Sequence, residues 1–222
     1  MKKVLCISDS LGLPRPGVPY IHTWLSLVKE ALPDIDFIPV FKRAATTDTL
    51  SCGGDYGDTL AFYPPDEVIL QLGICDCSPR YMRTTSFTYR LMRKMPGDLQ
   101  NVFWKIYKTF VKRSLDRTDV PLHRFRSNIE SYLNKCLELG IQRVIIIKIA
   151  EPGPKMLESN PLTRQSVARY NAIYDEIGDK YPFVTVIHPL DKSDDSFYVD
   201  GYHANLKGNQ LVAKYLQTLY HN

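Results

Sequence analysis

The chain has 222 residues, enough to bury a full hydrophobic core, and its 44% hydrophobic and 23% charged residues exclude a disordered tail or a coiled coil. We therefore expect a single domain over residues 1–222. No apolar run approaches the roughly 18 residues that span a bilayer, and Met1-Lys2-Lys3 leads directly into a strand-like segment without a small-residue cleavage site. The sequence thus predicts a soluble, cytoplasmic protein.

The formal net charge of +4 is distributed unevenly along the chain. Residues 80–126 hold twelve basic and three acidic side chains, a net charge of +9, which leaves −5 for the rest. A basic segment on an acidic body indicates an anionic partner, whether a membrane surface, an acidic glycan, a phosphate-bearing lipid or a nucleic acid. Nucleic acid ranks last because the segment has no recognisable nucleic-acid-binding motif.

The cysteines are five, an odd number, and they are scattered through strand-like and loop-like stretches. They are Cys6, Cys52, Cys75, Cys77 and Cys136. This distribution predicts reduced thiols and no disulfide framework. The C-x-C of Cys75 and Cys77 lacks a second pair of ligands, so we expect no metal site, and nothing in the sequence requires a cofactor.

Short apolar runs bounded by turn residues predict strands, and apolar residues at helical spacing predict helices. The strand-like segments are residues 4–7, 36–41, 67–72, 141–149 and 183–187. The helix-like segments are residues 22–32, 122–139, 163–180 and 206–220. Their alternation predicts a three-layer α/β/α fold around a five-stranded parallel sheet with right-handed crossovers, in which Pro39 marks an edge strand.

A basic and mostly helical insert at about residues 80–121 interrupts this alternation between strands three and four. Among its lysines it carries apolar side chains at helical spacing: Phe103, Trp104, Ile106, Tyr107, Phe110 and Val111. Such a helix fits an anionic membrane surface, but aromatic residues at this spacing are more often buried against the parent domain. We favour burial, with the lysines in solvent.

Two short stretches at opposite ends of the chain carry candidate chemistry. The first strand ends at Ser8-Asp9-Ser10, at the carboxyl edge where α/β sheets place ligands, although serine and aspartate there are also ordinary helix caps. Before the last helix stands Asp200-Gly201-Tyr202-His203. An aspartate three residues before a histidine can orient the imidazole so that its other nitrogen activates a serine. Ser10, His203 and Asp200 are thus candidates for nucleophile, base and orienting acid.

Ser8-Asp9-Ser10-Leu11 resembles the first block of the GDSL, or SGNH, hydrolase superfamily, with Ser8 where glycine is usual, and Asp200-Gly201-Tyr202-His203 matches its final D-x-x-H block. The resemblance implies a flavodoxin-like sheet and a catalytic triad of Ser10, His203 and Asp200, and the order Ser, Asp, His along the chain agrees. It covers nearly the whole core and leaves the basic insert unmatched.

The middle blocks of that family, which supply the oxyanion hole, depart from the pattern here. The glycine of the second block aligns with Thr47, and the asparagine of the third block aligns with Cys75. Threonine keeps its N–H, but a thiol is a weak donor. The resemblance implies an oxyanion hole formed by the Ser10 and Thr47 N–H groups, with Cys75 as a further candidate donor. Three outcomes are open: a slower enzyme, an enzyme with a rebuilt oxyanion hole, or an inactive protein. The candidates for substrate binding are Asp9, Gly73, Asp76, Arg43 and Arg80, and Arg15 is a further source of charge.

We therefore predict a serine esterase, for example a deacetylase, or an O-acyltransferase that acts on an acylated carbohydrate or a small ester. The carbohydrate follows from family analogy alone. Contact of the insert with an anionic membrane or a lipid-phosphate carrier would place the protein at the periphery of a membrane. The alternative is a catalytically weak or inactive relative whose insert binds an anionic glycan or a membrane surface. The sequence does not set the oligomeric state.

Overall fold

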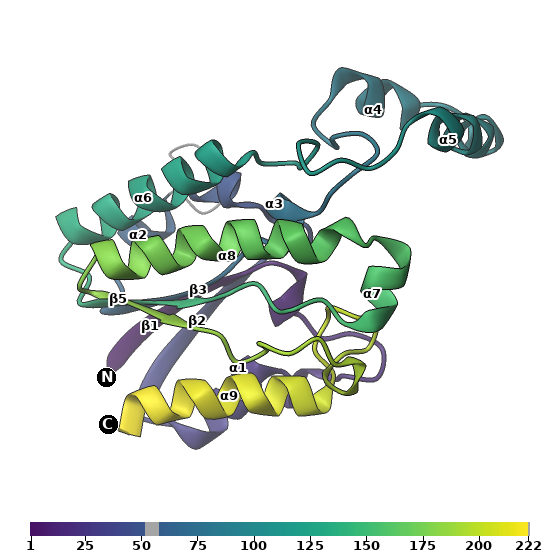
Figure 1. Ribbon diagram of the computed structural model, residues 1–222. Helices are drawn as coiled ribbons and strands as arrows, with labels where there is room; N and C mark the ends of the chain where they lie inside the picture. Colours follow the sequence, from purple (N-terminus) through teal and green to yellow (C-terminus); the bar gives the residue numbers. More distant parts are fainter. Residues whose placement is uncertain (52–57, 222) are drawn as a thin grey trace.

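The computed structural model describes residues 1–51 and 58–221; Cys52 lies outside this range. Its centre is a five-stranded, all-parallel sheet in the order β2-β1-β3-β4-β5 (Figure 1). The strands are β1 (Lys2–Ser8), β2 (Ile35–Phe41), β3 (Glu67–Gln71), β4 (Arg143–Ile147) and β5 (Val184–Ile187). The predicted sheet is confirmed, and Pro39 lies in the edge strand β2, where a residue without an N–H is tolerated.

Helices cover both faces of the sheet and complete the predicted three layers (Figure 1). One face packs against α1 (Trp24–Ala31) and α9 (Leu206–His221), and the other against α6 (Leu122–Glu138), α8 (Leu162–Lys180) and the short α2 (Thr59–Phe62) and α3 (Ile74–Cys77). Alternate residues of β1 serve the two layers, because Val4 and Cys6 pack toward α1 and α9 while Leu5 and Ile7 pack toward α6 and α8. Burial on both faces explains the continuous apolar run that precedes Ser8.

The insert between β3 and β4 contains α4 (Phe87–Met92) and α5 (Gly97–Phe110), which project away from the sheet beyond the ends of α6 and α8 (Figure 1). Its two ends are tied together, because the Arg80 N–H donates to the Arg117 carbonyl at 2.9 Å and the Arg117 side chain donates to the Tyr81 carbonyl at 2.8 Å. No helix in residues 1–51 and 58–221 is long and apolar enough to cross a membrane.

The expected burial of the insert aromatics against the parent domain is wrong. No residue of α5 is buried. Phe103, Trp104 and Tyr107 pack on one another instead, and Trp104 also packs on Tyr89 of α4, with ring centroids 5.6–6.4 Å apart. The aromatic spacing therefore marks an internal cluster of the insert, and not a contact with the core. A further short helix, α7 (Pro154–Ser159), follows β4 and was not predicted.

Candidate active site

Ser10, Asp200 and His203 come together at the carboxyl edge of the sheet, although 193 positions separate Ser10 from His203. Ser10 opens a 3-10 turn directly after β1, and His203 lies in the loop before α9. Ser10 Oγ lies 3.0 Å from His203 Nε2, and His203 Nδ1 lies 2.7 Å from Asp200 Oδ2. The Asp200 carboxylate also accepts the backbone N–H of His203 at 3.0 Å. The three side chains thus have the connectivity of a Ser-His-Asp triad.

The loop that carries Asp200 and His203 needs a glycine between them. Gly201 has φ +93°, a left-handed conformation, and a Cβ at this position would lie 2.6 Å from the Met156 backbone nitrogen. The next residue, Tyr202, lays its ring against the imidazole, with centroids 3.9 Å apart. The backbone turn and the tyrosine together fix the orientation of the His203 ring.

The electrostatic surroundings favour a neutral imidazole. Burial lowers the pKa of His203, Asp200 raises it, and the positive charges of Arg15 and Arg43 lower it again, so that it ends below its ordinary value. Burial raises the pKa of Asp200, but its hydrogen bonds with His203 outweigh this and hold the pKa below its ordinary value. With Nδ1 donating to the Asp200 carboxylate, Nε2 presents its lone pair to Ser10 Oγ, as a general base requires.

The Thr47 N–H, predicted to be a donor of the oxyanion hole, is engaged elsewhere in the structure. It donates to Asp76 Oδ1 at 2.9 Å, and the Thr47 hydroxyl donates to the same oxygen at 2.5 Å. Thr47 is fully buried, so in this arrangement its N–H is not available to a substrate. The Cys75 thiol donates to Asp9 Oδ2 at 3.7 Å beside Ser10. In residues 1–51 and 58–221 the Ser10 N–H has no hydrogen-bond acceptor, which leaves it as the free donor.

Asp9 and Asp76, both predicted to bind substrate, are fully buried and do not line the pocket beside Ser10. Asp9 accepts the Leu11 N–H at 2.8 Å and so shapes the turn that presents Ser10. Burial raises the pKa of each carboxyl to about 7. Asp76 holds Thr47 in place, and its other oxygen, Oδ2, has no partner within the described ranges. Asp9 and Asp76 therefore hold the backbone around the site in place and do not contact a substrate in the pocket.

Gly73, also a substrate-binding candidate, is required by the backbone. It precedes α3 with φ +117°, and a Cβ there would lie 2.7 Å from Ile149 Cδ1. The left-handed turn directs the chain so that Cys75 faces the nucleophile while Asp76 points into the interior. Gly73 thus sets the geometry of the block that follows it.

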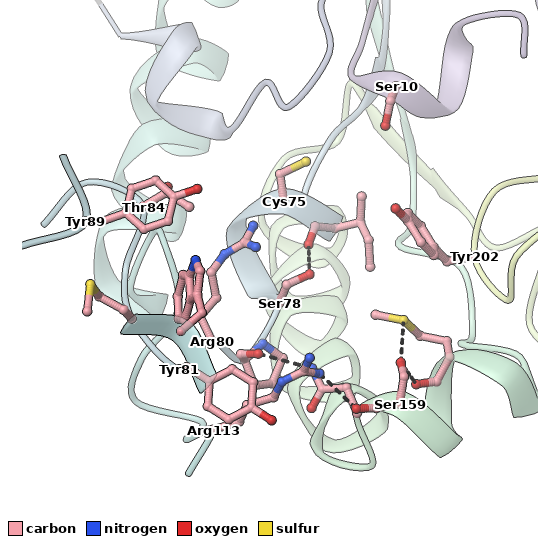
Figure 2. Close-up of a pocket in the computed structure, with 16 residues that line it drawn as sticks. Ser10, Cys75, Ser78, Arg80, Tyr81, Thr84, Tyr89, Arg113, Ser159 and Tyr202 are labelled. Atoms are coloured by element: carbon pink, nitrogen blue, oxygen red, sulfur yellow. Dashed lines mark hydrogen bonds between the residues drawn. The ribbon is translucent and has the colours of Figure 1, made fainter. Parts of the chain in front are cut away.

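A pocket of about 430 Å³ opens beside Ser10 (Figure 2). Of the substrate-binding candidates, Arg80 lines it, whereas Arg43 does not and reaches the site through its charge on His203. The other lining residues are Ile74, Cys75, Ser78, Pro79, Tyr81, Met82, Thr84, Tyr89, Trp104, Arg113, Met156, Ser159, Asn160 and Tyr202. Sequence reasoning missed the contributions of Tyr89, Trp104 and Arg113. Their only signal was the mixture of aromatic and basic residues in an insert without a family counterpart.

No protein-family model matches the sequence, and no curated protein matches it by sequence. Among solved structures, a lipase/acylhydrolase from Enterococcus faecalis superposes with a TM-score of 0.67 at 18% identity, covering 99% of this chain and 95% of its own. A catalytic mutant of an acetylxylan esterase from Geobacillus stearothermophilus gives a TM-score of 0.65 at 16% identity, covering 98% and 93%. A lipolytic protein of the G-D-S-L family from Desulfitobacterium hafniense gives 0.61 at 14%, covering 99% of each chain.

The chain therefore has the SGNH/GDSL hydrolase fold, as the resemblance of its first and last blocks predicted. Structures of esterases and acylhydrolases share this fold over almost their entire length with the present chain.

Proposed function

We propose that the protein is a serine esterase of the SGNH type acting on an O-acylated carbohydrate or a related small ester. The observation that carries the proposal is the continuous relay from Asp200 through His203 to Ser10, with contacts of 2.7 and 3.0 Å at the mouth of a pocket. In a fold without a chemical function, three such groups would have no reason to align on one another.

The reaction follows from these positions. Ser10 Oγ attacks the acyl carbonyl carbon while its proton passes to His203 Nε2, and the carbonyl oxygen becomes an oxyanion beside the Ser10 N–H. When the intermediate collapses, the ester C–O bond breaks, and His203 returns the proton to the departing alcohol. A water molecule then repeats the sequence on the acyl-serine and releases the carboxylic acid. A second alcohol in place of this water gives acyl transfer in the same site.

Two features support a carbohydrate ester. Tyr81, Tyr89 and Trp104 line the pocket, and aromatic faces offer a platform against which the C–H face of a sugar ring can pack. An acetylxylan esterase is among the structures that share the fold.

The test of the proposal is active-site labelling. The purified protein is treated with a fluorophosphonate probe and with a short-chain aryl ester, beside Ser10→Ala and the matched Ser131→Ala, which changes an exposed serine on α6 far from the pocket. We expect labelling and ester cleavage in the parent protein and in Ser131→Ala, and neither in Ser10→Ala. Labelling that persists in Ser10→Ala would remove Ser10 from the nucleophile role.

The second candidate function is a catalytically silent protein that binds an anionic glycan or a membrane surface. It is favoured by the engagement of the Thr47 N–H with Asp76, which deprives an oxyanion of one donor. A folded parent protein that neither takes up the probe nor cleaves esters, while it still binds a polyanion, would support this function over the esterase.

A further inference from the structure

The pocket beside Ser10 carries a positive charge that the esterase chemistry does not use. Among the described residues that line it, Arg80 and Arg113 are the charged ones. Figure 2 shows Ser10 at one end of the pocket, Arg113 and Tyr81 at the other, and Arg80 between the two ends. A substrate whose ester reaches Ser10 therefore extends past both guanidinium groups.

Arg80 is held in place but keeps donors free. Its Nε lies 2.6 Å from Asp119 Oδ2, a carboxylate with only 5% of its side chain exposed. Its two terminal nitrogens make no hydrogen bond to any residue within 1–51 and 58–221, and the pocket is on their side (Figure 2). The ion pair with Asp119 holds the guanidinium beside the pocket, and its pair of terminal N–H groups is suited to bidentate binding of an oxyanion.

Arg113 is the uncompensated charge of the pair. One terminal nitrogen donates to the Ser159 carbonyl at 3.1 Å, and the guanidinium carbon lies 4.9 Å from the centroid of the Tyr81 ring. Within the described part of the chain, Arg113 forms no ion pair with a carboxylate. The pocket lining therefore presents two guanidinium groups, of which only Arg80 is paired with a carboxylate, the buried Asp119, and the site is net positive.

We propose that this pocket selects esters whose remaining part carries an oxyanion, a phosphate or a carboxylate, bound between Arg80 and Arg113. The acyl group lies at Ser10, and the anion lies at the opposite end beside Tyr81. The inference rests on the proposed esterase function and names its substrate class: an acylated sugar or similar alcohol that is also phosphorylated or carboxylated.

The experiment compares three acetylated sugars that carry no anion, a carboxylate or a phosphate: O-acetylglucose, O-acetylglucuronic acid and O-acetylglucose 1-phosphate. Acetate release gives kcat/KM for each. We expect both anionic esters or one of them to exceed the neutral ester, and Arg80→Ala and Arg113→Ala each to lower the anionic-to-neutral ratio about 10- to 100-fold. The anionic ester with the higher kcat/KM shows whether the pocket prefers a carboxylate or a phosphate. Arg169→Ala, which removes an exposed arginine outside the pocket, should leave the ratio unchanged.

A second measurement separates failure of the subsite from failure of the esterase. Glucose 1-phosphate is titrated calorimetrically into Ser10→Ala protein, with and without Arg80→Lys or Arg113→Ala, after circular dichroism has confirmed that each variant is folded. Weakened binding in these variants supports the anion site even in a protein that cleaves no ester. Equal turnover of neutral and anionic esters, or binding that neither arginine affects, overturns it while leaving the esterase in place.

A different observation concerns the outer surface of the insert. Six apolar side chains on α4 and α5 and near their ends are 55–82% exposed, on the part of the molecule that projects from the sheet (Figure 1). They are Phe87, Leu91, Leu99, Val102, Ile106 and Phe110. The last four follow helical spacing along α5, so they form one stripe, which we call the outer apolar stripe. Large apolar side chains that are exposed together along one helix face indicate an interaction surface.

The charges around the outer apolar stripe indicate its occupant. Residues 87–112 hold six basic side chains and one acidic side chain, Asp98. The basic residues are Arg90, Arg93, Lys94, Lys105, Lys108 and Lys112. Lys108 is the exception in position, because its ammonium lies over the Tyr81 and Trp104 rings, 5.5–5.6 Å from their centroids, and not beside the stripe. Long lysine and arginine side chains can extend along a helix toward lipid headgroups while the apolar stripe enters the acyl region. Self-association through this surface would bring the same cations face to face, so an anionic bilayer fits better than a second copy.

We infer that the outer apolar stripe docks the insert on an anionic lipid bilayer. The test is sedimentation with vesicles of phosphatidylcholine alone or mixed with phosphatidylglycerol, using the full chain. We expect binding to the mixed vesicles only, reduced about tenfold or more in Ile106→Glu and Phe110→Glu. Leu137→Glu, on an exposed position of α6, is the matched control and should bind as the parent does.

Three outcomes would contradict lipid docking: equal sedimentation with neutral and anionic vesicles, unchanged binding of Ile106→Glu, or a dimer in analytical ultracentrifugation that this substitution dissociates. The last outcome would assign the stripe to a second copy of the chain. Ester cleavage measured on a soluble substrate is independent of all three.

Discussion

The substitution Cys75→Asn tests whether the oxyanion site lacks a donor. Cys75 lies beside Ser10 in the pocket, and its thiol, a weak donor, points to Asp9 Oδ2 at 3.7 Å. The Thr47 N–H is engaged by Asp76 at 2.9 Å, so the Ser10 N–H is the donor left for the developing oxyanion. An asparagine at position 75 is slightly longer than cysteine, extends into the open pocket, and adds an amide donor on the side of the nucleophile.

The expected gain follows from the known cost of the opposite change. Removing one oxyanion donor from a serine protease costs about 3–4 kcal/mol in transition-state stabilisation. The new amide would also be drawn to the Asp9 carboxyl, and giving up that hydrogen bond costs about 1 kcal/mol. The difference, about 2–3 kcal/mol, corresponds to a rise in kcat of about 30- to 150-fold. KM should change little, because the new hydrogen bond strengthens only in the transition state.

The assay is steady-state cleavage of a neutral aryl ester by the parent protein, Cys75→Asn and Cys75→Leu. Leucine has nearly the shape of asparagine without a donor, so a gain through packing alone would appear in both variants. A kcat that stays level or falls in folded Cys75→Asn would refute the reasoning. It would mean either that position 75 does not face the oxyanion or that another group, such as Arg80, already completes the site.

Three further predictions concern the triad and its support. Asp200→Asn should lower kcat about 10³- to 10⁴-fold, measured on the same ester, because the amide no longer fixes the tautomer of His203. In the parent protein kcat/KM should rise with pH as His203 loses its proton, and it should reach half its plateau below pH 6.5 because burial lowers the pKa of His203. A midpoint above pH 6.5 would contradict a His203 pKa lowered by burial. Gly73→Ala should destabilise the fold by about 2–4 kcal/mol in urea unfolding, from the left-handed φ and the contact with Ile149, whereas Gly97→Ala, with open space around its Cβ, should cost less than about 1 kcal/mol.

The sequence was most informative where one physical requirement dominates the choice of residue. β1, β3 and β4 are buried on both faces, so their apolar runs could be recognised without knowledge of their neighbours. Gly140 follows the C-cap of α6 with φ +74°, the left-handed conformation in which glycine commonly ends a helix. Ser10, Asp200 and His203 could be named in advance because their chemistry requires particular residue types near the two ends of the chain.

What could not be predicted depends on contacts between distant segments. Asp76 accepts from Thr47, 29 positions earlier, and no local pattern announces that this hydrogen bond takes the expected oxyanion donor. The spacing of Phe103 and Trp104 is the same whether the rings pack on the sheet or on their own insert, so the sequence could not decide between burial and projection. Arg113 lines the pocket because the insert folds back until its two ends meet, a contact between segments that no local sequence pattern specifies.

Residues of the insert form part of the pocket wall, so a movement of the insert would change the shape of the pocket and, for the proposed esterase, its substrate specificity. The Arg80 N–H donates a hydrogen bond to the Arg117 carbonyl at the base of the insert, and the Arg80 side chain forms an ion pair with Asp119. The same side chain lines the pocket. Trp104 contributes to the same pocket from α5, the helix whose opposite surface is exposed. A ligand or surface that shifts α5 must therefore reposition a wall of the pocket, while the triad, held by β1 and the loop before α9, stays in place. For the proposed esterase, we therefore expect a shift of α5 to change the choice of substrate and to leave the chemistry at Ser10 unchanged.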